Sequence, residues 1–173
     1  MTARPVTTPR DEVDRVVAAW RRERPDLDVA PLQVFSRISR LARQLDRARS
    51  AAFEARRLEL WEFDVLAALR RAGEPYELSP GQLVAQTLVT SGTMTNRLDR
   101  LQARELVVRR PDPGDRRGVI VALTPPGREL VDLALADLLE REQALLTAVD
   151  GEDREALAAL LRRLAVQFDD PAD

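Results

Sequence analysis

Only one part of this 173-residue chain has the residue pattern of β-strands, and it limits the possible folds more than any other feature. Two runs, LVVRR at 106–110 and VIVALT at 119–124, flank the sequence PDPGD and predict a β-hairpin, because proline, aspartate and glycine favour the turn between them. Arginine pairs stand on both sides of that turn, at 109–110 and 116–117. Since four neighbouring guanidinium groups repel one another, we expect the hairpin to meet an anionic partner.

Helical patterns account for the rest of the chain, because apolar residues recur there at three- and four-residue steps. The predicted helices cover residues 11–23, 31–55, 59–72, 80–87, 91–105, 127–149 and 152–168. Ser79 is the expected N-cap of the helix at 80–87, with Pro80 at its first position and Gln82 completing a capping box. Thr90 or Ser91 is the expected cap of the helix that follows.

Two short helices joined by a tight turn and followed by a hairpin predict a winged helix-turn-helix domain in a mainly α-helical chain. The expected organisation is a disordered lead (1–10), N-terminal helices of a dimerisation region (11–57), the winged domain (58–124) and C-terminal dimerisation helices (125–170). The long helices carry apolar stripes that so small a domain cannot cover alone. We therefore expect a homodimer.

Composition argues against an enzyme, although serine and paired-carboxylate chemistry remain possible in principle. The chain has no cysteine and no histidine, and all 27 of its basic residues are arginine. Thiolate nucleophiles, histidine bases and lysine bases are therefore ruled out, and we expect no catalytic residue, no metal site and no cofactor. The carboxylates Asp150, Glu152 and Asp153 are better explained by the start of a helix than by a metal. The N-terminus lacks a signal peptide and no apolar run spans a membrane, so the expected location is the cytoplasm.

The helix at 91–105 is predicted to be the DNA-reading element. Its apolar stripe is formed by Met94, Leu98 and Leu101, and small and polar residues lie opposite. Asparagine pairs with adenine and arginine with guanine or phosphate, while arginines at a hairpin tip fit the minor groove. The expected DNA contacts are Ser91, Thr93, Thr95, Asn96, Arg100, Arg116 and Arg117, with Asp115 orienting Arg117. Residues 90–117 contain seven arginines and four carboxylates on a chain of net charge -2, which is a local basic patch.

Other interpretations remain open at this point. Any amphipathic surface helix shows small polar residues outward, and the alternative function is a helical dimer that binds protein through its winged domain. DNA binding predicts a steep loss of affinity with salt, whereas protein binding does not.

The stretch TSGTMTNRLDRLQARELVVRRPDPGDRRGVIVALTPPGREL, residues 90–130, resembles the MarR family of bacterial transcriptional regulators. Its wing carries the family's Asp-x-Arg, here Asp115 and Arg117, before a strand that ends in Leu-Thr. The stretches AAWRRERPDLDVAPLQV and LWEFDVLAALRRAGEPYELSP are similar to the urate-responsive, PecS-like branch. Relatives commonly have glycine where this chain has Arg57, before Leu58.

The resemblance implies a ligand site formed by Trp20, Asp64, Arg97 and Arg109. It implies a regulator, a repressor in the simplest case, that binds a palindromic operator in double-stranded DNA and is released by a small organic anion. Urate or a related purine is the first candidate for this anion, and other aromatic or carboxylic acids are the next candidates. The helical spacing independently supports a ligand-binding role for Arg97. This residue lies at the edge of the buried stripe and requires an anion, either an internal carboxylate or a ligand. Trp20 is also compatible with core packing at helical spacing.

Overall fold

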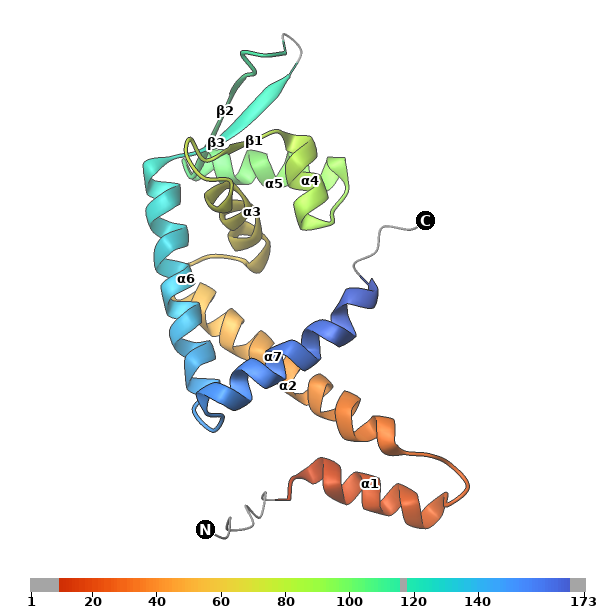
Figure 1. The fold of residues 1–173 in the computed structure, drawn as a ribbon. Coiled ribbons are helices and arrows are strands. Elements are labelled where there is room, and N and C mark those ends of the chain that lie inside the picture. Colours follow the sequence, from red (N-terminus) through yellow and green to blue (C-terminus); the bar gives the residue numbers. More distant parts are fainter. Residues whose placement is uncertain (1–9, 116–117, 169–173) are drawn as a thin grey trace. The chain divides into compact units, whose positions relative to one another are not determined.

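The computed structural model describes residues 10–115 and 118–168, and these form a mainly helical fold with one three-stranded antiparallel sheet (Figure 1). The elements are α1 (Glu12–Glu23), α2 (Ala30–Glu54), α3 (Leu60–Arg71), β1 (Glu77–Leu78), α4 (Pro80–Thr87), α5 (Ser91–Ala103), β2 (Val107–Pro111), β3 (Val119–Leu123), α6 (Pro125–Leu145), α7 (Gly151–Ala165) and a final 3-10 turn (Val166–Phe168). The chain divides into two compact units, Met1–Arg47 and Ala48–Asp173, each with its own hydrophobic core.

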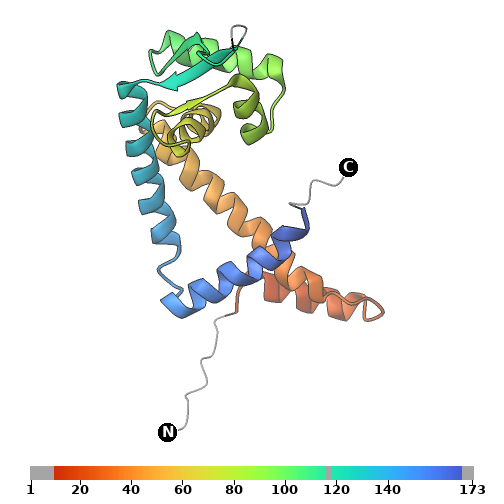
Figure 2. The ribbon, with the colours of Figure 1, turned by 45° about the horizontal axis from the view of Figure 1, so that its top comes forward.

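The predicted fold class is confirmed. Helices α4 and α5 form the helix-turn-helix, and β2 and β3 form the hairpin that follows it. The two-residue strand β1 was not predicted, because it is too short to show an alternating pattern. It pairs with β3 through Glu77 opposite Ala122 and Leu78 opposite Val121, so that β3 lies in the middle of the sheet (Figure 2).

The first unit contains α1 and the first part of α2. Val13 and Val17 of α1 are buried against Val29, which explains their helical spacing. Arg37 of α2 donates to the carboxylates of Asp11 and Asp14, at 2.8 and 2.9 Å, and so ties the start of α1 to α2. The backbone N–H of Asp14 is the main cause of the lowered pKa of Asp11, which caps α1.

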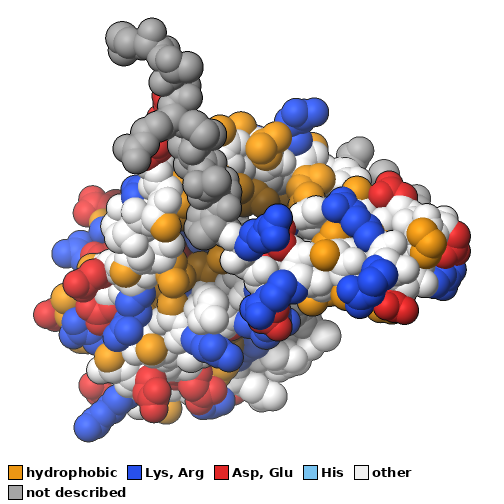
Figure 3. All heavy atoms as spheres, turned by 90° about the horizontal axis from the view of Figure 1, so that it is seen from below, with side chains coloured by type: hydrophobic (Ala, Val, Ile, Leu, Met, Phe, Trp, Pro, Cys, Tyr) orange, Lys and Arg blue, Asp and Glu red, His pale blue; other side chains and the backbone are white. Residues whose placement is uncertain are grey.

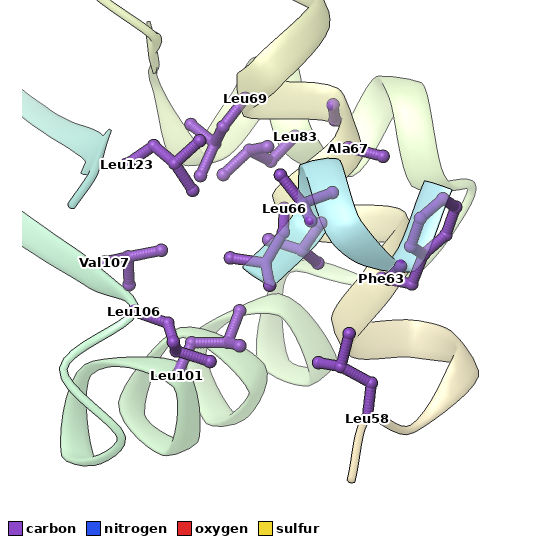
Figure 4. Close-up of a cluster of buried hydrophobic side chains, with 14 of the residues drawn as sticks. Leu58, Phe63, Leu66, Ala67, Leu69, Leu83, Leu101, Leu106, Val107 and Leu123 are labelled. Atoms are coloured by element: carbon purple, nitrogen blue, oxygen red, sulfur yellow. The ribbon is translucent and has the colours of Figure 1, made fainter. Parts of the chain in front are cut away.

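The core of the second unit lies between α3 and the helix-turn-helix. Fully buried side chains converge there from α3, α4, α5 and β2; they include Leu66, Leu69, Leu83, Leu101 and Val107 (Figure 4). Met94, Leu98 and Leu101 are each at most 1% exposed, which confirms the predicted buried stripe of α5. The predicted Ser79–Gln82 capping box is also confirmed, and Thr90 rather than Ser91 caps α5.

Helix α4 ends at Leu88, a non-glycine residue in the left-handed backbone region, and α2 and α5 are also followed by such residues. After α2, Arg57 has φ 51° and the N–H of Leu58 donates to the carbonyl of Phe53 at 2.9 Å. After α5, Glu105 has φ 58° and the N–H of Leu106 donates to the carbonyl of Leu101 at 3.0 Å. Both ends have the bonds of a Schellman motif, in which glycine is preferred because it has no Cβ to clash. This backbone position therefore favours the glycine that the family resemblance implies where this chain has Arg57.

Replacing Arg57 or Glu105 by glycine should therefore raise the free energy of unfolding, by about 0.5–1 kcal/mol each, because relief of left-handed strain exceeds the added backbone entropy. Chemical denaturation of the two variants and of the wild type measures this. The matched control is Arg56→Gly, since Arg56 precedes the left-handed residue and pairs with Asp137; this variant should be less stable than the wild type. A loss of stability in both test variants would contradict the strain argument.

The C-terminal helices leave many apolar side chains in solvent. On α6 the exposed leucines are Leu133, Leu135, Leu139 and Leu145, and on α7 they are Leu157, Leu160, Leu161 and Leu164. Helix α7 buries none of its residues. Hydrophobic side chains are visible among the charged ones on the face that Figure 3 shows. Within the described residues, no helix combines the length and the apolar character that crossing a membrane requires.

Candidate DNA-binding surface and ligand site

The outward face of α5 is formed by short polar side chains at its N-terminal end. Ser91, Thr93, Thr95 and Asn96 are all exposed, and Asn96 lies opposite the buried stripe. The Thr95 hydroxyl donates back to the carbonyl of Ser91 at 3.1 Å. The Asn96 amide forms no hydrogen bond with any described residue and is open to a base edge. This surface meets the steric and chemical needs of a helix in the major groove.

The hairpin extends from the same domain. Its strands are joined across the turn by the N–H of Asp112, which donates to the carbonyl of Gly118 at 3.0 Å. Arg110 of β2 pairs with Glu77 of β1. The predicted minor-groove contacts Arg116 and Arg117 lie outside the described residues, so their role, and that of Asp115 in orienting Arg117, stay predictions.

Arg100 lies on α5 but its guanidinium points toward α3. It pairs with the carboxylate of Glu59 and lies 4.6 Å from the centre of the Trp61 ring. One turn further, Arg104 donates to Glu62 at 2.5 Å, and this glutamate is only 2% exposed. Glu59, Trp61 and Glu62 were not predicted from the sequence. The available signal was two glutamates around a tryptophan at the start of a predicted helix, together with arginines at steps of three and four residues at 97, 100 and 104.

Arg97 is half-buried, as its helical angle predicted. Its guanidinium lies 5.4 Å from the centre of the Trp61 ring, and it forms no ion pair with a carboxylate of the described residues. The contact of this guanidinium is therefore an aromatic ring, where we expected an anion. A half-buried cation without a carboxylate partner favours binding of an anionic ligand.

Arg109, at the base of the wing, is the other arginine of the predicted ligand set. It donates to the carboxylate of Asp99 at 2.5 Å and to the carbonyl of Thr95 at 3.1 Å, both on α5. Its side chain is 27% exposed. Arg109 thus joins β2 to the helix that carries the predicted DNA contacts, and a ligand that binds this guanidinium must compete with Asp99.

Asp64 lies on α3, exposed, one turn after Trp61. Partial desolvation is the main cause of its raised pKa, against the smaller lowering effects of Arg49, Arg97 and Arg71. No ion pair joins Asp64 to Arg97 in the described part of the chain. Trp20 belongs to α1 in the first unit and is 48% exposed, so its membership of the ligand set stays a prediction.

The raised pKa of Asp64 has a consequence for stability. Because the folded-state pKa lies above the usual value of 3.8, the ionised carboxylate destabilises the fold at neutral pH, and the effect vanishes once pH falls below that usual value. Asp64→Asn should therefore be more stable than the wild type at pH 7, by about a few tenths of a kcal/mol for so exposed a group. Urea denaturation at pH 7 and at a pH below 3.8 measures this difference. A stability gain that persists unchanged in acid would contradict the assignment.

The comparisons with known proteins agree with this geometry. Residues 58–118 match the model of the MarR family. The regulator PecS of Dickeya dadantii is 41% identical, over 88% of this chain and 92% of PecS. The transcriptional repressor NicR of Pseudomonas putida is 33% identical, over 80% of this chain and 88% of NicR.

Two solved structures relate the fold to DNA and to ligands. A MarR variant from E. coli, solved with operator DNA, matches with a TM-score of 0.65 at 26% identity, covering 79% of this chain and 94% of the other. BpsR of Bordetella bronchiseptica, whose DNA binding is regulated by 6-hydroxynicotinic acid, matches with a TM-score of 0.57 at 31% identity. The match covers 75% of this chain and 98% of BpsR. The chain therefore belongs to the MarR family of transcriptional regulators, in its PecS-like branch, and is a DNA-binding protein rather than an enzyme.

Proposed function

We propose that this regulator is a homodimeric repressor that acts in the cytoplasm, binds a palindromic operator and is released by a planar organic anion. The dimer is supported by α6 and α7, on which eight leucines are 37–56% exposed and need an apolar partner. A second copy supplies the matching surface. Two α5 helices related by a twofold axis then face half-sites about 10 bp apart.

DNA contact is assigned to the exposed face of α5, through Ser91, Thr93, Thr95 and Asn96, with Arg100 and the wing residues Arg116 and Arg117. Support comes from the open amide of Asn96 and from the likeness to a MarR structure with operator DNA. The side chains of Arg100 and Glu59 are 58% and 55% exposed, so a phosphate or base can reach the guanidinium while its contact with Glu59 is kept.

The observation that carries the anionic effector is Arg97, a half-buried guanidinium whose partner is an aromatic ring and not a carboxylate. Asp64 on α3, Arg109 on the wing and Trp20 on α1 complete the proposed set. A planar heteroaromatic anion offers oxygens to the arginines and a flat face to an aromatic side chain. Urate is the first candidate, and the regulation of BpsR by 6-hydroxynicotinic acid supports the same chemical class.

The test is a mobility-shift titration on the DNA upstream of the protein's own gene, with urate, xanthine, salicylate or 6-hydroxynicotinic acid added. We expect one planar anion to weaken operator binding about 5- to 150-fold, and Arg97→Ala to abolish that response. Asn96→Ala is the matched DNA variant: it should weaken operator binding by about 1–3 kcal/mol and leave binding to unrelated DNA unchanged. Operator binding that none of the four anions affects would contradict the proposed effector class.

A further inference from the structure

Arg97 and Arg100 of α5 and its C-cap residue Arg104 follow one another at steps of three and four residues and so share one stripe of the helix. All three contact the first turn of α3. Arg104 pairs with buried Glu62, Arg100 pairs with Glu59, and Trp61 between these two glutamates contacts both Arg97 and Arg100. This stripe is a principal polar connection between α3 and the helix that reads DNA.

Trp61 holds the central place in that connection. Its ring centre lies 5.4 Å from the Arg97 guanidinium and 4.6 Å from that of Arg100. Its indole Nε1 donates to Glu59 at 2.5 Å, and the second oxygen of the same carboxylate accepts from Arg100. These two hydrogen bonds are the main causes of the lowered pKa of Glu59, so the carboxylate is held ionised beside Arg100.

We propose that Trp61 is the positioning residue that couples Arg97 to Arg100, so that an anion bound at Arg97 changes the placement of the DNA-reading helix. The part of this inference that concerns the anion rests on the proposed function. The part that concerns the placement of α5 does not.

The coupling follows from two cations sharing one ring. A cation–π contact holds each guanidinium to Trp61, and an anion that pairs with Arg97 draws this guanidinium from the ring because a charged partner is the stronger one. The ring then loses one of its two contacts with α5. Since Trp61 is hydrogen-bonded to Glu59, a shift of the ring also moves the carboxylate that holds Arg100. Helix α5 consequently loses part of its fixed orientation on α3.

Substitution of Trp61 tests the proposal in the full-length protein. Operator affinity is measured by fluorescence anisotropy, with and without saturating urate, for Trp61→Leu and Trp61→Phe. Trp61→Leu should weaken operator binding about 2- to 30-fold without urate, and urate should then change it by less than about twofold. Trp61→Phe keeps an aromatic face, so we expect it to retain most of the wild-type affinity and urate response.

Tyr76→Leu is the matched control, because Tyr76 also contacts two guanidiniums, those of Arg70 and Arg128, at 4.9 and 5.6 Å, but none on α5. It should lose stability without losing the urate response. The proposal is overturned if Trp61→Leu behaves as the wild type, or if Tyr76→Leu loses affinity and response to the same extent. If the wild-type protein does not respond to urate, urate is not the effector and the coupling of urate binding to α5 is contradicted. In that case, a loss of operator affinity confined to Trp61→Leu would still support the placement of α5 by Trp61.

Discussion

Replacing Gly127 by alanine should destabilise the second unit by about 1–3 kcal/mol or more. Gly127 is buried in the first turn of α6, where a Cβ would overlap the carbonyl oxygen of Leu106 and lie 3.0 Å from its carbon and 3.1 Å from Leu123 Cδ1. The nearest atoms belong to the backbone, so α6 itself has to shift. Thermal unfolding measures the effect, at about 2–4 °C per kcal/mol for a chain of this size.

Gly151→Ala is the control for the loss of a glycine as such. Gly151 begins α7, is exposed, and a Cβ there meets no atom within 4 Å. Its substitution should leave stability unchanged or raise it by up to about 1 kcal/mol. An equal fall in both variants would contradict the close approach of α6 to Leu106.

Arg104→Ala should cost about 2–3 kcal/mol of unfolding free energy, because it leaves Glu62 charged, 2% exposed and without its guanidinium. Urea denaturation at neutral pH measures the loss. Adding Glu62→Gln removes the unpaired charge, so the double variant should recover part of the stability.

Arg24→Ala is the matched surface control. Arg24 pairs with Asp26 at 2.6 Å, nearly the distance of the Arg104–Glu62 pair, but the two side chains are 49% and 58% exposed. Its loss should cost less than about 1 kcal/mol. If both arginine variants cost the same, burial of Glu62 does not determine the strength of this contact.

The sequence was sufficient for the winged helix-turn-helix because its signals are local. The buried stripe of α5, the Ser79 cap and the hairpin all follow from residues within one or two turns of each other. Strand β1 and the left-handed ends at Arg57 and Glu105 were not predicted. The first depends on a partner more than forty residues away in the chain, and the other two use residues that ordinarily avoid that backbone region.

The partial burial of Arg97 could be predicted from the sequence, but the contacts around it could not. Helical angle alone placed Arg97 at the edge of the core, and the structure agrees. The same reasoning assigned Arg100 to the outward face, whereas its guanidinium meets Glu59 and Trp61 of α3. A long side chain reaches beyond the face of its own Cα, so its partner depends on tertiary packing that periodicity does not encode.

A spacing series on the operator tests most directly whether two copies present their α5 helices to successive major grooves. Half-sites are located by footprinting the upstream DNA, and affinity is then measured after inserting 5 bp between them, which turns one half-site to the opposite side of the duplex. We expect the affinity to fall to the level of unrelated DNA. Affinity that does not depend on the spacing would contradict the paired arrangement of the α5 helices.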